Sequence, residues 1–382
     1  MAQYCLALKT SGGYNWLLND STNYLGLMPA GAPVDTVYCA VAGYLSSIEI
    51  KDNGQAWAWG VETDGALGNN QATGIESTPV AVCGNHTFCE ISFKDGGIGI
   101  DNNNVAWAWG DNQWGRLGNN SVTTTCTPVS VYGTHDWAKV HLDTIFTTAV
   151  DESGNMWAWG NNSSGQLGNN AAVNKSTPVA VYGGIKPTDF TNGYAHSVAL
   201  SLGIAAWGYN AHGELGDNTT VSKSTPVAVC GGITKPMALA STYYSTTVIS
   251  DSGDVYSWGG NSYGELGDGT LIDRSTPVAV YGNLKLVSVS AHFHHILGLS
   301  SDGYVYAWGY NTHGELGDNT TTSKCIPVKV CGSHDFCAIS AGTTHSMAID
   351  DNGVVWTWGY NLNYKLGDGT QTDRHTPVCV TV

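Results

Sequence analysis

The chain has 382 residues, only 12% of them charged, and it is rich in glycine (49), tryptophan (14) and tyrosine (19). Its apolar residues are ordinary in number and evenly spread, which excludes intrinsic disorder, and no apolar run approaches the ~18 residues of a membrane-spanning helix. The formal net charge of −16 repels phosphate groups, so neither nucleic-acid binding nor membrane insertion is expected.

The first ten residues lack a basic start followed by an apolar core, so we expect no signal peptide. The sequence does not distinguish a cytoplasmic location from a virion or extracellular one. The rest of the chain is dominated by a repeat of roughly 50 residues. Each copy carries a Trp-Gly pair, then a Leu-Gly pair, then a Pro-Val step. We interpret the tryptophans as structural anchors: Trp59, Trp109, Trp159, Trp207, Trp258, Trp308 and Trp358.

Eight copies are predicted in chain order. Residues 1–36 form a degenerate copy, in which Leu17-Leu18 occupies the Trp-Gly position, and atypical terminal copies are expected of repeat folds. The full copies span residues 37–82, 83–131, 132–181, 182–229, 230–280, 281–330 and 331–382.

Within the last copy, "CAIS", "HSMAID", "VVWTWG" and "TPVCV" predict four strands. Trp356 and Trp358 alternate with Thr357, so the two indoles point to one face, and Pro377 suits an edge strand. Four-stranded units that cannot bury both faces alone predict blades stacked around an axis. The expected fold is all-β, a single β-propeller over residues 1–382 whose termini meet near one blade. Eight hairpins indicate eight blades, and a seven-bladed ring is the alternative.

The segments 257–280, 307–330 and 340–359 resemble the repeat of the regulator of chromosome condensation family. The resemblance covers essentially the whole chain, which is identified as a bacterial or viral-type member. It implies a propeller that is usually seven-bladed, and it implies protein docking, as in the propeller-shaped β-lactamase inhibitors of bacteria. The founding member is a nucleotide exchange factor for a small GTPase and contacts chromatin, with a protruding wedge and a basic tail. This chain has no insertion in any copy and no basic tail, so exchange is the least favoured role. The Gly-Trp-Arg-His-Thr segments of the related plant UV-B photoreceptor are also missing.

Residues that break the repeat are the candidates for partner binding, because aromatic and arginine side chains anchor interfaces. They are Trp114, Arg116, Tyr243, Tyr244 and Tyr263. For Trp114 an exposed contact and a packing role stand equal. Trp137 is predicted to fill a packing position that holds phenylalanine in other copies.

Three histidines, His196, His295 and His345, share one repeat position near the central channel. They suggest either a metal site, to which His292 and His294 would add two ligands on one strand face, or hydrogen bonds to neighbouring backbone. We favour the hydrogen bonds. Repeated acidic residues near Leu-Gly suggest calcium binding or steering of a basic partner, or, as favoured, loop hydrogen bonds. These residues are Glu214, Glu265, Glu315, Asp217, Asp268, Asp318 and Asp368.

Most of the ten cysteines are interpreted as small buried side chains, and the pairs Cys83/Cys89 and Cys331/Cys337 as the only candidate disulfides. No catalytic constellation, metal-binding spacing or cofactor motif occurs, so we expect no enzyme, no metal and no cofactor. The first functional hypothesis is a non-catalytic propeller that docks a protein partner on a rim. The alternative is an extracellular or virion-surface module that binds glycans or a cell-surface receptor.

Overall fold

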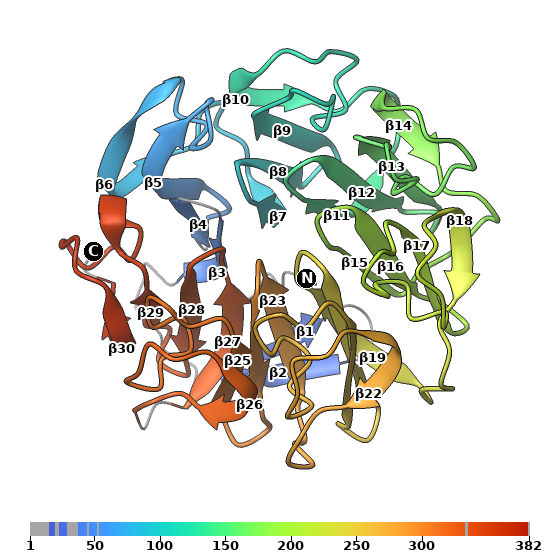
Figure 1. Ribbon diagram of the computed structural model, residues 1–382. Coiled ribbons are helices and arrows are strands. Elements are labelled where there is room, and N and C mark those ends of the chain that lie inside the picture. The colour runs from blue at the N-terminus through green and yellow to red at the C-terminus, as the bar shows by residue number, and fades with distance from the viewer. Residues whose placement is uncertain are drawn as a thin grey trace.

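The computed structural model describes residues 15–19, 23–28, 37–43, 46–51, 53–332 and 335–380. These residues form seven four-stranded sheets and one two-stranded sheet, all antiparallel. The four-stranded sheets are blades around a central axis, with the first strand of each blade innermost and the fourth at the perimeter (Figure 1). The predicted all-β propeller is therefore confirmed.

The strands of each blade follow one another in the chain. Blade 1 has β3 (Val37–Ala42), β4 (Ser46–Lys51), β5 (Ala56–Thr63) and β6 (Thr73–Ala81). Blade 2 has β7 (Phe88–Phe93), β8 (Gly96–Asp101), β9 (Ala106–Gly110) and β10 (Thr125–Ser130). Blade 3 has β11 (Trp137–Leu142), β12 (Phe146–Asp151), β13 (Met156–Gly160) and β14 (Lys175–Ala180). Blade 4 has β15 (Asp189–Asn192), β16 (His196–Leu200), β17 (Ile204–Gly208) and β18 (Lys223–Ala228).

The remaining blades repeat the same order. Blade 5 has β19 (Pro236–Ser241), β20 (Ser245–Ser250), β21 (Val255–Gly259) and β22 (Arg274–Ala279). Blade 6 has β23 (Ser288–His292), β24 (His295–Leu299), β25 (Val305–Gly309) and β26 (Lys324–Lys329). Blade 7 has β27 (Phe336–Ala341), β28 (His345–Asp350), β29 (Val355–Gly359) and β30 (Arg374–Cys379), with a short 3-10 helix, η2 (Leu362–Tyr364), before β30.

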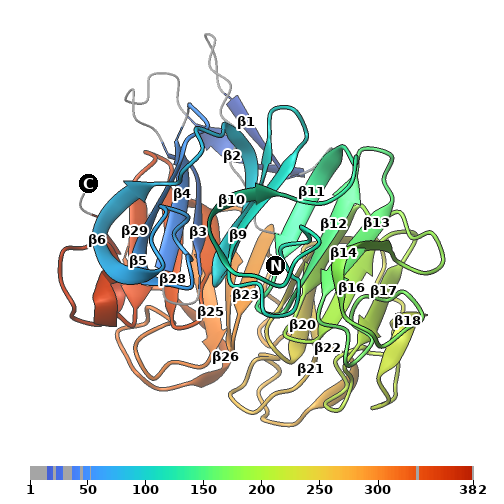
Figure 2. The same cartoon turned by 90° about the horizontal axis from the view of Figure 1, so that it is seen from above.

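The eighth predicted unit is not a blade. Its described residues form only the hairpin of β1 (Asn15–Asn19) and β2 (Asn23–Met28), which lies outside the ring of blades, where β2 contacts β27 (Figures 1 and 2). The count of eight blades is therefore wrong and the seven-bladed alternative is confirmed. The predicted meeting of the chain termini falls outside the described residues.

Tryptophan from the third strand fills the space between each blade and the preceding one. All seven predicted anchors are fully buried, and each lies in an apolar cluster with residues of the neighbouring blade. Six of them also donate a hydrogen bond from Nε1 to a backbone carbonyl of the previous blade, as Trp207 does to Gln166 at 2.9 Å. The Leu-Gly glycine leaves room for the ring: a Cβ on Gly168, which has φ +65°, would lie 2.6 Å from Nε1 of Trp207.

The ring closes between blades 7 and 1, where β3 lies against β27 and β28. Trp59 of blade 1 packs with Met347, Val355 and Val380 of blade 7. Its Nε1 is the exception among the anchors, because it is buried and no described residue accepts a hydrogen bond from it.

A buried asparagine shapes the long loop between the third and fourth strands in blades 2 to 7. Asn162, for example, accepts from the backbone N–H of Leu167 at 3.0 Å and donates to Asn169 Oδ1 and to the carbonyls of Ala171 and Val173. The same contacts recur at Asn112, Asn210, Asn261, Asn311 and Asn361.

Blade 1 has Glu62 at the position of this asparagine. Its carboxylate accepts from the N–H of Leu67 but has no N–H to donate to the loop carbonyls. The loop there is replaced by continued pairing of β5 and β6, from Val61 with Ile75 to Thr63 with Thr73. Burial raises the pKa of Glu62 to about 7.

Candidate functional site

Two sets of loops lie on one side of the ring. Because the strands of a blade are antiparallel, the loop between the first two strands and the loop between the last two emerge at the same end, as the pairing of Phe146 with Gly160 shows. We call this side the loop face. It comprises the inner loops, 94–95, 143–145, 193–195, 242–244, 293–294 and 342–344, and the outer loops, 111–124, 161–174, 209–222, 260–273, 310–323 and 360–373.

Arg116 lies beneath the loop face and does not reach solvent. Its side chain is fully buried, and its guanidinium donates to the backbone oxygens of Asp95, Asp111 and Thr144, each at 2.6 Å. The prediction that Arg116 contacts a partner is therefore wrong. Arginine has five donors and no acceptor, so it can hold three loops whose carbonyls face one another. Arg116 thus positions the outer loop that carries Trp114.

Three of the predicted interaction residues, Tyr243, Tyr244 and Tyr263, belong to an aromatic cluster on blades 4 to 6. Tyr243 stacks on Tyr194 with ring centroids 5.1 Å apart, and Tyr244 lies 6.4 Å from Tyr209. Tyr263 is 40% exposed. We define the aromatic cluster as eight residues, each in ring contact with another: Tyr194, Tyr209, Tyr243, Tyr244, Tyr263, Phe293, His294 and Tyr310. His212 and His292 contact it at Tyr244 and Tyr243.

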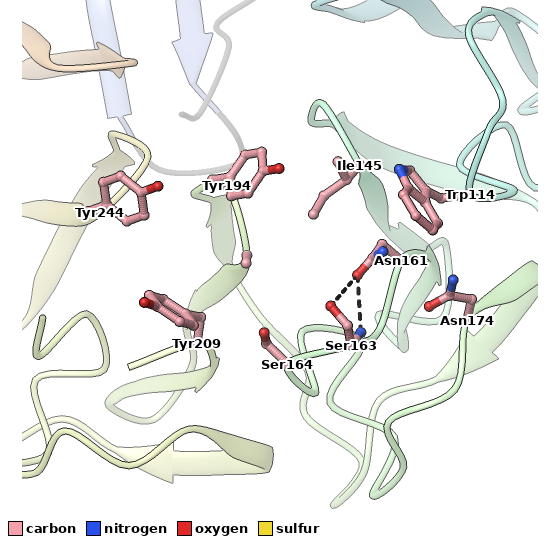
Figure 3. Close-up of a pocket in the computed structure, with 10 residues that line it drawn as sticks. Trp114, Ile145, Asn161, Ser163, Ser164, Asn174, Tyr194, Tyr209 and Tyr244 are labelled. Atoms are coloured by element: carbon pink, nitrogen blue, oxygen red, sulfur yellow. Dashed lines mark hydrogen bonds between the residues drawn. The ribbon is translucent and has the colours of Figure 1, made fainter. Parts of the chain in front are cut away.

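Trp114 lies across a groove from this cluster. The groove has a volume of about 520 Å³. Figure 3 shows Trp114 and Ile145 on one side of it and Tyr194, Tyr209 and Tyr244 on the other. The remaining lining residues are Asn161, Ser163, Ser164, Asn174 and Ala195. Trp114 was interpreted either as a binding contact or as a packing residue. Its half-buried position at the groove agrees with a binding contact, and this role stays a prediction.

The three channel histidines form hydrogen bonds between blades. Nε2 of His196 meets Thr246 Oγ1 at 3.1 Å, and His295 and His345 meet Ser346 and Ser47 in the same way. Burial lowers the pKa of His196 and of His295 to about 3, so both rings are neutral. The favoured hydrogen bonds are present, although the partners are hydroxyl groups of the next blade and not backbone.

No metal site is formed from the described residues: they contain no group of three or more His, Cys, Asp or Glu side chains that could hold an ion. His292 and His294 do not lie together, as the alternative of a metal site would have required. His292 bonds Thr343 in the channel, while His294 bonds Glu265 Oε1 at 2.6 Å on the loop face.

The repeated acidic residues serve the loops, as favoured. Asp268 accepts from the N–H and hydroxyl of Thr270 and pairs with Arg274, and Asp217, Asp318 and Asp368 accept equivalent bonds. Glu315 accepts from the N–H of His313, and burial raises its pKa to about 7.

The eight described cysteines for which a state is defined are all free, so neither of the two candidate loop disulfides is formed. Only Cys337 among them is buried, which also corrects the interpretation of most cysteines as core residues. Trp137, in contrast, is buried as predicted, in the packing position that Phe190 and Phe336 occupy in other blades. None of the described residues forms an apolar helix of membrane-spanning length.

Of the ten residues that line the groove, sequence reasoning identified only Trp114 and Tyr244. The missed residues include Asn161, Asn174, Tyr194 and Tyr209. Tyr209 does not break the repeat, because blades 6 and 7 have Tyr310 and Tyr360 at the equivalent position, so no signal in the sequence marked it. Asn161 and Asn174 look like ordinary loop residues until their neighbours are known.

Comparison with solved structures shows the same fold elsewhere. Human WBSCR16 matches with a TM-score of 0.78 and 18% identity, over 86% of this chain and 94% of that one. Prp20p of Saccharomyces cerevisiae, described with its binding to Gsp1p and histones, matches with a TM-score of 0.74 and 19% identity, over 93% and 87%. Yeast Prp20 bound to Kap60 matches with a TM-score of 0.74 and 18% identity, over 98% and 90%. At these identities the likeness is one of fold alone.

The sequence itself matches a known family across its larger part. Residues 96–382 match the RCC1-like domain, which begins at β8 and includes every later blade. The bacterial or viral subtype stays a prediction. By this match the chain belongs to the family of RCC1-like domains, as its repeats predicted.

Proposed function

We propose that this chain is a non-catalytic propeller that docks a protein partner on its loop face. The observation that carries the proposal is the aromatic cluster, in which eight ring side chains from the loops of three consecutive blades gather on the loop face. Tyrosine and tryptophan supply large contact areas with few rotatable bonds, which is why they dominate the energy of protein interfaces.

A rigid support for these rings favours docking over induced rearrangement. The outer loops that carry Tyr209, Tyr263 and Tyr310 are held by the buried amides of Asn210, Asn261 and Asn311, so little order remains to be gained there on binding. Prp20, which shares the fold, is itself described with protein partners, Gsp1p and Kap60. The net charge of −16 favours a partner with basic surface around the contact.

The non-catalytic part of the proposal rests on the way in which the titratable groups are used. His–carboxylate pairs recur at equivalent places, His212 with Asp273 at 2.9 Å and His313 with Asp373 at 3.0 Å. A pair that is repeated between blades is typical of loop architecture, whereas a catalytic centre needs one unmatched constellation. Glu315, although its pKa is raised to about 7, is fully buried and out of reach of a substrate.

Site-specific photo-crosslinking tests the proposal. A photoreactive phenylalanine analogue replaces Tyr263 in the aromatic cluster or, as the control, Tyr182, which is 58% exposed and lies outside the cluster. Irradiation in the native source should give one crosslinked polypeptide from position 263 and none from position 182. Crosslinking from position 182 alone, or from neither position, would refute docking through the aromatic cluster.

A glycan ligand is the second candidate, because Trp114 and three tyrosines offer flat rings on which sugars can stack. Binding of a glycan array by the wild-type chain, lost in Trp114→Ala, would favour it.

A further inference from the structure

The groove between Trp114 and Tyr244 has a hydrogen-bonding character that its composition alone does not reveal. Its lining contains no charged side chain, so it is suited to a neutral ligand. A volume of about 520 Å³ falls within the range of roughly 300–1,000 Å³ typical of binding pockets.

The two asparagines of the groove have fixed orientations. Oδ1 of Asn174 accepts from the backbone N–H of Asn162 at 2.8 Å. Oδ1 of Asn161 accepts from the N–H and hydroxyl of Ser163 and from Nε2 of Gln166, at 2.8 to 3.0 Å. Because backbone N–H groups can only donate, neither amide can be turned round without losing a bond.

The amide NH₂ groups of both residues are consequently left for the groove. Neither donates a hydrogen bond to any described residue, and Figure 3 shows both nitrogens on the side of Trp114. The indole N–H of Trp114 has no acceptor among the described residues either, unlike those of six of the seven anchors. The amide groups therefore offer the groove mainly donors: Oδ1 of Asn161 already accepts three bonds, and Oδ1 of Asn174 accepts one and keeps a single lone pair.

A ligand for this groove needs acceptors, flat apolar faces and few donors of its own. Proline-rich chain in the polyproline II conformation fits this description. Proline has no N–H, its carbonyls point outward without internal hydrogen bonds, and its rings pack on aromatic side chains. A sugar ring would bring several O–H donors, for which the side chains of the groove offer few acceptors, namely hydroxyl oxygens and one lone pair of Asn174 Oδ1.

We propose that the groove lined by Trp114, Asn161, Asn174, Tyr194, Tyr209 and Tyr244 binds a proline-rich segment of the protein partner in the polyproline II conformation. This inference rests on the proposed protein docking and names the partner's recognition element. The aromatic rings hold the proline rings, and the two amides and the Trp114 indole donate to the peptide carbonyls.

The test measures binding of a fluorescent, end-capped decaproline peptide to the full chain by anisotropy, with a Gly-Ser decamer as the reference. The discriminating variant is Asn174→Asp. It keeps an oxygen for the N–H of Asn162 but turns two donors into an acceptor that repels peptide carbonyls. Asn174 is exposed, so the fold should tolerate the change.

Saturable binding of decaproline, weakened at least tenfold by Asn174→Asp and by Trp114→Ala and unchanged by Tyr182→Ala, supports the inference. No binding of decaproline by the wild-type chain overturns it, as does equal affinity of the Asn174→Asp variant. Binding of chitotriose or cellotriose without binding of decaproline overturns it in favour of a carbohydrate site. If position 263 still crosslinks to a protein when decaproline does not bind, only the proline inference fails; if neither occurs, the proposed docking fails as well.

Discussion

Replacement of Asn162 by alanine should loosen one wall of the groove. Asn162 is fully buried, and its amide forms the bonds that fold the outer loop of residues 161–174 back on itself. That loop supplies Asn161, Ser163, Ser164 and Asn174 to the groove.

The size of the effect follows from which partners water can reach. The N–H of Leu167 is buried and would lose its acceptor, at a cost of about 1–3 kcal/mol. The carbonyls of Ala171 and Val173 lie at the surface and would be hydrated, so they add little. With the small cavity left by the side chain, the free energy of unfolding should fall by about 2–4 kcal/mol.

Denaturant unfolding measures the loss, and hydrogen exchange followed by mass spectrometry locates it. Asn311→Ala in blade 6 is the matched control, since Asn311 makes the same bonds to Leu316, Asp318 and the carbonyl of Thr322. Both variants should lose similar stability, with faster exchange in residues 161–174 for the first and in 310–323 for the second. Unchanged exchange in residues 161–174 of the Asn162→Ala variant would show that the amide does not hold the loop.

Three further predictions concern the core. Trp358→Phe should destabilise the chain by about 1–3 kcal/mol more than Trp59→Phe in denaturant unfolding. Trp358 donates to the carbonyl of Glu315 at 2.8 Å, whereas Nε1 of Trp59 has no acceptor among the described residues, and equal losses would contradict this reasoning. Glu315→Gln should leave stability unchanged near pH 4.5 and raise it by roughly 3 kcal/mol above pH 7. The reason is that the folded-state pKa of Glu315, about 7, exceeds its ordinary value of 4.5. The wild-type chain therefore loses stability as pH rises between these two values, and the glutamine variant does not. A pH-independent difference between Glu315→Gln and wild type would refute that assignment. Trp137→Phe should cost at most about 2 kcal/mol, less than the roughly 3–5 kcal/mol of Trp137→Ala, because Phe190 fills the same position in blade 4, and the two melting temperatures check the order.

The burial of Arg116 and the number of blades could not be predicted from the sequence, for related reasons. Arg116 was singled out because it breaks the repeat, which is a property of sequence. Its burial depends on carbonyls of Asp95 and Thr144, which come from the inner loops of two different blades. Similarly, residues 1–36 carry a hairpin pattern, but a hairpin becomes a blade only if the ring has a gap for it. The packing of Trp59 against blade 7 leaves none.

The groove could not be predicted either, because its residues come from different blades. Tyr194, Tyr209 and Tyr244 come from the inner and outer loops of blades 4 and 5, and Trp114 comes from blade 2. Their separations in sequence carry no sign of contact. The direction of the Asn174 amide, which decides whether the groove offers donors or acceptors, depends on one backbone N–H twelve residues earlier.

The sequence by itself determined the blade: its four strands, its tryptophan anchor and the glycine beside that anchor. These features follow from local periodicity and from the need to bury two apolar faces, and the residues responsible are present within each copy of the repeat. Only the tertiary structure decided the number of blades, the burial of Arg116 and the donor character of the groove. Each of these depends on distances between blades, and such distances arise when the ring closes and are not encoded in any single repeat.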